Sequence, residues 1–293
     1  MPAYKKQHYL PCSYLKYFST DQNQCNRTSL IWQFDRTSCR TVVVESQCSG
    51  DYFYSKQQPA EIEKTFQPNE EAYSTCIEII RNNQELPDRG IGDLLLTMFD
   101  LHLRNAAHKN RTGHEGIEAY RQRVGIFLGR ILLCREEGEI PKSEIKYHLE
   151  HYWRVRIIIC PASHQFLTSD HPSIWRTLGQ VVPGLKTRLH LMALPLTPQL
   201  LGVAYDNRVV EITGNQATSA DVGYANFCQV QNAERSLYMS KRLPLEQLQK
   251  FQNFFIGKPP TPSESNEEGW QIAWIPLPNK NYFSFMRLKG IPF

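Results

Sequence analysis

The chain has 293 residues, of which 41% are apolar, 11% aromatic and 21% charged, as in a soluble globular protein with a core that needs neither metals nor disulfides. No apolar run approaches the roughly 20 residues of a membrane span, and the N-terminal segment lacks the apolar core of a signal peptide, so we expect a cytoplasmic protein. The net charge of +4 does not by itself indicate a nucleic-acid partner.

The first half of the chain predicts a hairpin followed by helices. The segments LIWQFDR and RTVVVE predict two strands around the turn DRTSC. In PNEEAYSTCIEII, apolar residues recur at i, i+3, i+4 and i+7, which predicts a helix that begins at Pro68. The same pattern predicts helices over Ile91–His108 and Glu115–Arg135.

The pattern changes after Trp153, where segments rich in strand-forming residues follow one another. RVRIIIC, QFLTS, RLHLMALPL and LLGVAYD predict strands, and helices are expected at about 217–238 and 244–255. A surface loop at 258–269 precedes the strand segments WQIAWIPL and YFSFMRL. Helices followed by strands without regular alternation predict an α+β fold, with a helical layer from the N-terminal half packed on a mainly antiparallel or mixed sheet. We expect one domain over 1–293, and the alternative is a change of layer or subdomain near 153.

The eight cysteines form no Cys-x-x-Cys pair, which argues against a zinc knuckle or a redox dithiol. Several stand on apolar helical stripes, so we expect reduced and mostly buried thiols.

Two N-terminal stretches contain candidate site residues. His8 stands just before a short helix whose first turn Pro11 begins, so its imidazole is either a proton-transfer group or a structural hydrogen-bonding group. Glu63 and Glu70 are two turns apart on one face of a continuous helix. Pro68 lies between them, and Glu70 also suits the first turn of a helix that starts there.

The segment FLTSDHPS, from Phe166 to Ser173, ends a predicted strand with hydroxyls, a carboxylate and an imidazole. Strand ends are where side chains become available to ligands, which makes Asp170 a candidate. The alternative is that Asp170 caps a turn by accepting hydrogen bonds from nearby backbone N–H groups.

The segment RNAAH, Arg104 to His108, is one residue shorter than the Arg-Asn-x-x-x-His signature of HEPN ribonucleases. Asp93, Thr97, Asp100, Arg104 and His108 form the polar stripe of an apolar helix. We interpret this stripe as a solvated face with an Asp100–Arg104 pair. Motifs for nucleotide phosphates, dinucleotides, serine hydrolases and zinc proteases are missing from the sequence.

As an ordered set, these stretches resemble a mainly bacterial family known as domain of unknown function 4238. The resemblance rests on His8-Tyr9-Leu10-Pro11, on IWQFDR and DYFYS, on Glu63 with Glu70, on FLTSDHPS, and on the helix that carries Asn226. It spans about residues 7–240. The resemblance implies an association with anti-phage defence and selects His8, Glu70, Asp170 and Asn226 as site candidates.

Two functions remain open from the sequence. In the first, the protein is a nuclease-like enzyme in which Glu70 and Asp170 hold a divalent cation such as magnesium, His8 transfers a proton and Asn226 positions the substrate. In the second, it is a non-catalytic binding or sensor module whose polar residues join the helical and sheet layers. RNA or DNA and a defence-system protein are the expected partners, no membrane is expected, and the sequence does not set the oligomeric state.

The nucleic-acid hypothesis draws on the basic stretch at 102–123 and on the segment from Gly269, which has Lys and Arg among aromatic residues and no acidic ones. For Asp170 we expect a position at the end of a central strand, with the carboxylate near His8 and Asn226. Thr168 and Ser169 are then the hydroxyl donors that keep it ionised.

Overall fold

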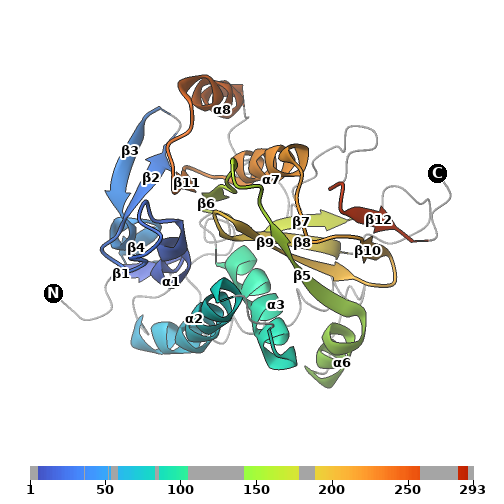
Figure 1. Cartoon of the computed structure of the whole chain (residues 1–293). Coiled ribbons are helices and arrows are strands. Elements are labelled where there is room, and N and C mark those ends of the chain that lie inside the picture. Colours follow the sequence, from blue (N-terminus) through green and yellow to red (C-terminus); the bar gives the residue numbers. More distant parts are fainter. Residues whose placement is uncertain are drawn as a thin grey trace.

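Two four-stranded antiparallel sheets form the centre of the computed structural model (Figure 1). The structure describes residues 6–35, 37–51, 53, 59–82, 86–104, 142–177, 189–257 and 283–289. The larger sheet has the order β5 (Trp153–Ile159), β9 (Leu200–Asp206), β8 (Leu189–Thr197) and β7 (Ile174–Thr177). The second sheet has the order β3 (Cys39–Val43), β2 (Leu30–Phe34), β11 (Leu237–Met239) and β6 (Thr168–Ser169).

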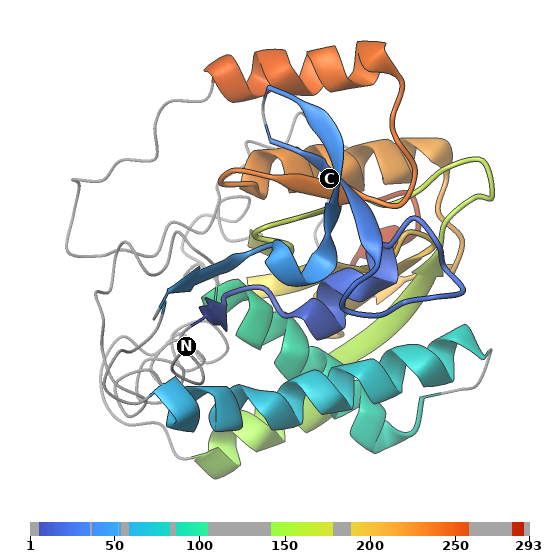
Figure 2. The same ribbon diagram turned by 90° about the vertical axis from the view of Figure 1, so that its left-hand side faces the viewer.

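Two short antiparallel pairs join segments that are distant in the sequence. They are β1 (Lys6–His8) with β4 (Ser49–Asp51), and β10 (Val210–Ile212) with β12 (Met286–Leu288). A short helix α1 (Cys12–Leu15) continues into a 3₁₀ turn, η1 (Lys16–Phe18), and a second 3₁₀ turn, η2 (Val44–Ser46), follows β3. Figure 2 shows β1 and α1 between the β2–β3 hairpin and the long helix α2 (Pro59–Arg81).

Helices cover both faces of the larger sheet (Figure 1). On one face, α3 (Asp88–Leu103) packs against β5 and β8, beside α2. On the other face, α7 (Ser219–Asn232) contacts β7 and also the outer helix α8 (Leu245–Gly257). The helix α6 (Lys142–Tyr152) leads directly into β5. The predicted α+β class is therefore confirmed, and α7 adds a second helical layer from the C-terminal half.

A glycine in β9 lets α3 approach the sheet closely. A Cβ atom on Gly202 would lie 2.7 Å from Cε of Met98 and 3.2 Å from Cδ1 of Leu196, so a larger residue there would require these side chains to shift. Met98 itself is fully buried in the largest hydrophobic core, which also contains aromatic residues of the two layers: Phe99 of α3, Trp153 of β5 and Trp175 of β7. Side chains of this core hold α3 against the larger sheet.

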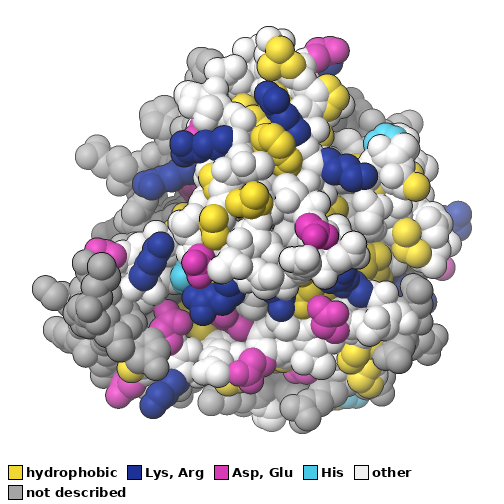
Figure 3. Space-filling view, turned by 60° about the vertical axis from the view of Figure 1, so that its left-hand side comes forward, with side chains coloured by type: hydrophobic (Ala, Val, Ile, Leu, Met, Phe, Trp, Pro, Cys, Tyr) yellow, Lys and Arg dark blue, Asp and Glu magenta, His cyan; other side chains and the backbone are white. Residues whose placement is uncertain are grey.

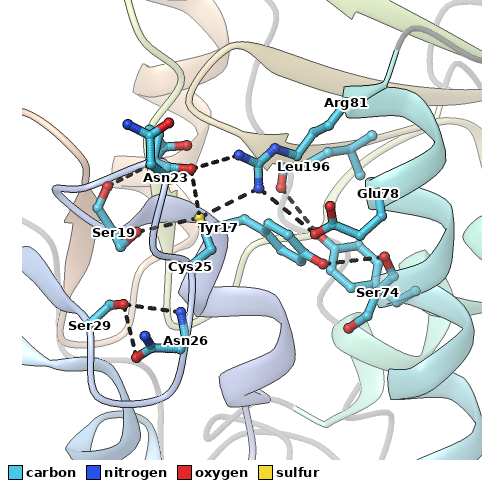
Figure 4. Close-up of polar contacts among 12 residues, drawn as sticks. Tyr17, Ser19, Asn23, Cys25, Asn26, Ser29, Ser74, Glu78, Arg81 and Leu196 are labelled. Carbon is cyan, nitrogen blue, oxygen red and sulfur yellow. Dashed lines mark hydrogen bonds and ion pairs between the residues drawn. The ribbon is translucent and has the colours of Figure 1, made fainter.

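The loop at 19–29 is attached to the C-terminal end of α2 through Arg81 (Figure 4). One guanidinium nitrogen of Arg81 donates to the carbonyl of Gln22 at 2.7 Å, and the other lies 3.6 Å from the thiol of Cys25. Tyr17 adds a bond from its hydroxyl to the carbonyl of Ser74 in α2 at 3.3 Å. These contacts hold the N-terminal segment against α2.

Most predicted elements in the described ranges are confirmed, and α2 is the main correction. The helix expected at about 217–238 ends at Asn232, and residues 237–239 form β11 instead. The β2–β3 hairpin forms as expected, with a register that pairs Leu30 with Val43 and Phe34 with Cys39. The helix predicted to start at Pro68 instead begins at Pro59, so Pro68 lies inside it. The predicted helix at 115–135, the loop at 258–269 and the segment WQIAWIPL lie outside the described residues.

The cysteine prediction is confirmed where the structure describes these residues. Seven thiols are free, and five of them are buried: Cys12, Cys48, Cys76, Cys160 and Cys228. Cys134 lies outside the described ranges. Of the helices in these ranges, none combines the length and the apolar character that crossing a bilayer requires.

Candidate functional site

A buried arginine connects three N-terminal elements. Arg104 follows α3 and its side chain is 1% exposed. Its Nη1 donates to Oε1 of Glu70 at 2.9 Å and to Oδ2 of Asp100 at 3.2 Å, while Nη2 donates to the carbonyl oxygen of His8 at 3.0 Å. The guanidinium also lies 3.9 Å from the ring centre of Phe66. We call His8, Glu63, Glu70, Asp100 and Arg104 the Arg104 cluster.

Local helix geometry brings the members of the Arg104 cluster together. Because α2 continues through Pro68, residues 63, 66 and 70 share one face of that helix. Asp100 and Arg104 are four residues apart at the end of α3, the spacing at which helical side chains meet. The strand β1 then passes over Arg104 and presents the His8 carbonyl to it.

Glu70 is fixed at both carboxylate oxygens. Oε1 accepts from Arg104, and Oε2 accepts from the hydroxyl of Ser13 at 3.3 Å. Its side chain is 27% exposed, so the pair with Arg104 joins a buried cation to a carboxylate that reaches the surface. A charge-assisted bond of this kind orients Glu70 firmly.

The imidazole of His8 has a defined tautomer. Its Nε2 lies 3.1 Å from the carbonyl oxygen of Glu45. Because a carbonyl only accepts, Nε2 carries the hydrogen and Nδ1 carries the lone pair. No described residue hydrogen-bonds to Nδ1. Burial lowers the pKa of His8, and the charges of Arg27 and Lys6 act in the same direction, while the bond to Glu45 and the charge of Glu70 oppose them.

The carboxyl group of Glu63 has a shifted pKa. Burial raises the pKa of the Glu63 carboxyl group, the positive charge of Arg104 opposes this effect, and the negative charge of Glu70 adds to it. Among the described residues, none hydrogen-bonds to the Glu63 carboxylate. The cluster thus contains a neutral imidazole with a lone pair and a carboxyl group that holds its proton more strongly than usual.

Figure 3 shows the face with the N-terminal segments, where acidic and basic side chains intermingle over the lower half.

Asp170 has a different environment. It directly follows β6, an edge strand of the second sheet, whereas we expected a central strand. The side chain is 1% exposed, and its carboxylate accepts from the backbone N–H groups of Glu234 and Arg235 at 2.8 Å and of Ser236 at 3.3 Å. Burial raises the pKa of Asp170 to about 6, against the effect of these three bonds. Asp170 therefore fastens the end of β6 to the segment between α7 and β11.

The other polar residues of FLTSDHPS also bond within the fold. The Thr168 hydroxyl contacts the Tyr14 hydroxyl at 2.7 Å, and the Ser169 hydroxyl donates to Gln229 of α7 at 2.8 Å. The expectation that they donate to Asp170 is wrong, because both hydroxyls face other partners. Asn226 accepts from the N–H of Leu167 at 2.8 Å and donates to the carbonyl of Gln165 at 2.9 Å. These bonds hold α7 against the segment that leads into β6.

The four candidates thus fall into two groups. His8 and Glu70 meet through Arg104, whereas Asp170 and Asn226 bond to backbone groups around β6 and α7. Neither His8 nor Asn226 is a hydrogen-bond partner of Asp170, contrary to expectation. Glu70 and Asp170 have separate partners, and the described part of the chain shows no group of three or more His, Cys, Asp and Glu side chains arranged for a metal ion.

Arg104, the most buried member of the Arg104 cluster, does not lie on a solvated face as the sequence analysis predicts. The predicted Asp100–Arg104 pair forms, but the solvated face is wrong, because Thr97, Asp100 and Arg104 are all buried. His108 lies outside the described residues. The sequence does contain a signal for this pairing. It has a cationic residue at the end of α3 and inward carboxylates on α2, and buried charges require partners of opposite sign.

Comparisons with known proteins agree with the motifs. Searches of curated proteins and of solved structures gave no match. A family model described as "Protein of unknown function (DUF4238)" matches residues 6–125 and 137–242. These ranges include His8, Glu70, Asp170 and Asn226 and cover most of the chain. The chain therefore belongs to the DUF4238 family.

Proposed function

We propose that this protein is a nuclease-like hydrolase of phosphodiester bonds and that the Arg104 cluster is its catalytic site. The observation that carries the proposal is the fixed tautomer of His8, which leaves the lone pair of Nδ1 as a proton acceptor at neutral pH. A general base needs this combination of a lowered pKa and an available lone pair.

The second proton-transfer group is Glu63. Its raised pKa favours the protonated form, which suits a group that donates a proton to a leaving oxygen. In the proposed reaction, Nδ1 of His8 takes the proton of the attacking hydroxyl or water as its oxygen bonds to phosphorus. The bond from phosphorus to the leaving oxygen breaks, and Glu63 protonates that oxygen.

Positive charge beside His8 supports an anionic substrate. Arg27 and Lys6 are both exposed and act electrostatically on the imidazole. They can neutralise a phosphate that enters from solvent, whereas Arg104 is already engaged by Glu70, Asp100 and the His8 carbonyl. Arg104 therefore positions Glu70 and β1 in this proposal.

The remaining candidate residues, the magnesium ion and the role in defence differ in what supports them. Glu70 keeps a place in the catalytic cluster, while Asp170 and Asn226 organise the adjoining fold. A magnesium ion shared by Glu70 and Asp170 has no supporting contact between those residues in the structure. The role in anti-phage defence, with a partner protein of that system, is a proposal that the family resemblance alone supports.

A substrate panel tests the proposed activity. The purified protein is incubated with labelled single-stranded RNA, tRNA and single-stranded DNA, with and without magnesium or manganese. We expect cleavage of at least one substrate by the wild type and a loss of about 10²–10⁴-fold in rate for His8→Gln. The matched control is His164→Gln, because His164 is a histidine outside the cluster that contacts its neighbour Ser163.

Cleavage that survives in folded His8→Gln would contradict the proposal, as would the absence of any cleavage across the panel. Circular dichroism and thermal unfolding of each variant separate a catalytic loss from unfolding.

A non-catalytic binding module is the second candidate. It is favoured by the contacts of Thr168, Ser169, Asp170 and Asn226, which all use their polar groups inside the fold. If the wild type binds RNA or DNA with a steep dependence on salt but cleaves neither, this candidate replaces the hydrolase.

A further inference from the structure

Two histidines, one from α3 and one from the loop after β6, point ring nitrogens at each other. Nδ1 of His102, near the end of α3, lies 3.2 Å from Nε2 of His171, which follows Asp170. The two ring centres are 5.0 Å apart with the planes tilted by 46°. Both side chains are half-buried.

The 3.2 Å distance between the two nitrogens suits a metal ion bound by both of them as well as a hydrogen bond between them. Two imidazole nitrogens that each lie about 2.05 Å from one zinc ion and are 3.2 Å apart subtend an angle of about 100° at the metal, close to tetrahedral. If both lone pairs point at that ion, the ring centres lie about 5 Å apart, because each is about 1.1 Å behind its nitrogen. The observed ring separation is 5.0 Å.

The surrounding residues hold His102 in this orientation. Its ring stacks on Trp175 with centres 3.7 Å apart and planes 20° apart. The indole nitrogen of Trp175 donates to the Ser173 hydroxyl at 2.9 Å, and that hydroxyl donates to the carbonyl of Met98 in α3 at 2.9 Å. A fixed outer layer of this kind pre-organises a ligand and reduces the entropic cost of metal binding.

We propose that His102 and His171 form a binding site for a divalent transition-metal ion. Imidazole nitrogens favour zinc, nickel and copper, whereas magnesium and calcium favour oxygen ligands. In the metal-free state one nitrogen donates a hydrogen to the other, and the ion replaces that hydrogen. The bound ion joins α3 to the loop after β6 and is independent of the proposed phosphodiester hydrolysis.

Isothermal titration calorimetry with Zn²⁺ and with Ni²⁺ tests the site in the wild type, His102→Gln, His171→Gln and the control His164→Gln. We expect one ion per chain in the wild type and in the control. Each ligand variant is expected to bind at least about tenfold more weakly. Binding is also expected to weaken as the pH falls, because protons compete with the ion for the nitrogen lone pairs.

Tryptophan fluorescence during a Ni²⁺ titration provides a readout that depends on position. An ion at Nδ1 of His102 lies next to the ring stacked on Trp175, so we expect quenching with the same midpoint as the calorimetry and little quenching in His171→Gln. Equal affinity in the wild type and both ligand variants would overturn the proposal. No binding by the wild type above pH 7 would overturn it as well. Neither result depends on nuclease activity.

Discussion

Arg104 is a guanidinium in the protein interior, and its stability depends on the acceptors around it. Burying a cation is costly unless opposite charges and hydrogen bonds compensate it. Arg104 has two carboxylates, a backbone carbonyl and the face of Phe66 as partners. Removal of the cation leaves Asp100 buried beside Glu70 with no compensating charge from Arg104.

The first prediction is that Arg104→Ala lowers the free energy of unfolding by about 3–5 kcal/mol, because a broken buried ion pair leaves uncompensated charge. Urea denaturation measures the change. The matched control is Lys250→Ala, since Lys250 pairs with Glu246 at the same i,i+4 spacing but both side chains are mostly exposed. That variant should lose less than about 1 kcal/mol. Similar losses in the two variants would contradict the role assigned to burial.

The second prediction concerns Asp170 and pH. Burial raises the pKa of its carboxyl group from 3.8 to about 6. An acid with a higher pKa in the folded state binds more protons there, so the free energy of unfolding falls as pH rises from about 4 to about 6. The difference of about 2 pKa units corresponds to about 3 kcal/mol.

Urea denaturation between pH 4 and pH 7 measures this effect for the wild type and Asp170→Asn, which does not titrate at that position. The stability of the wild type relative to the variant should decrease across this range. A relative stability that stays constant would show that the three backbone hydrogen bonds balance burial, and one that increases with pH would show that they outweigh it.

At the scale of elements, α2 shows what a sequence pattern does and does not specify. The i, i+3, i+4 and i+7 pattern after Pro68 identified the C-terminal half of the helix, including buried Tyr73 and Ile77. The sequence predicts that the helix starts at Pro68, because proline is favoured in the first turn and disfavoured inside a helix. Packing of Phe66 under Arg104 instead supports the preceding turns.

The third prediction is that Pro68→Ala raises the free energy of unfolding by about 1–3 kcal/mol. Pro68 is exposed, and alanine restores the missing backbone hydrogen bond to residue 64. Thermal unfolding measures the change. Gln67→Ala is the control, because it alters the neighbouring exposed position, where a bond to Glu71 is lost, without changing the backbone. If the proline variant is no more stable than the wild type, strain at position 68 is negligible.

At the scale of the whole molecule, local pattern predicted the α+β class and most strands and helices, but the site depends on contacts between distant segments. Arg104 meets Glu70 across 34 residues and His8 across 96 residues. Periodicity indicates which residues share a helix face, but it does not indicate what covers that face. This is why the buried stripe of α3 was interpreted as solvated.

The same limit applies to Asp170. The sequence left two roles open for Asp170, a site carboxylate and a cap of backbone N–H groups. The observed cap lies on a segment more than 60 residues away, between α7 and β11. Local sequence could not reveal that partner, because β6 and β11 pair only after the sheet assembles. Of the joint site inferred from the resemblance, only His8 and Glu70 come together.

The pH dependence of kcat/KM for phosphodiester cleavage tests the proposed function most directly. With His8 as base and Glu63 as acid, the profile should be a bell. Its acidic limb should report the lowered pKa of His8 and its alkaline limb the raised pKa of Glu63. The residual activity of His8→Gln should lose the acidic limb, and that of Glu63→Gln should lose the alkaline limb. Limbs that persist in both folded variants would contradict the assignment of this pair as the catalytic acid and base.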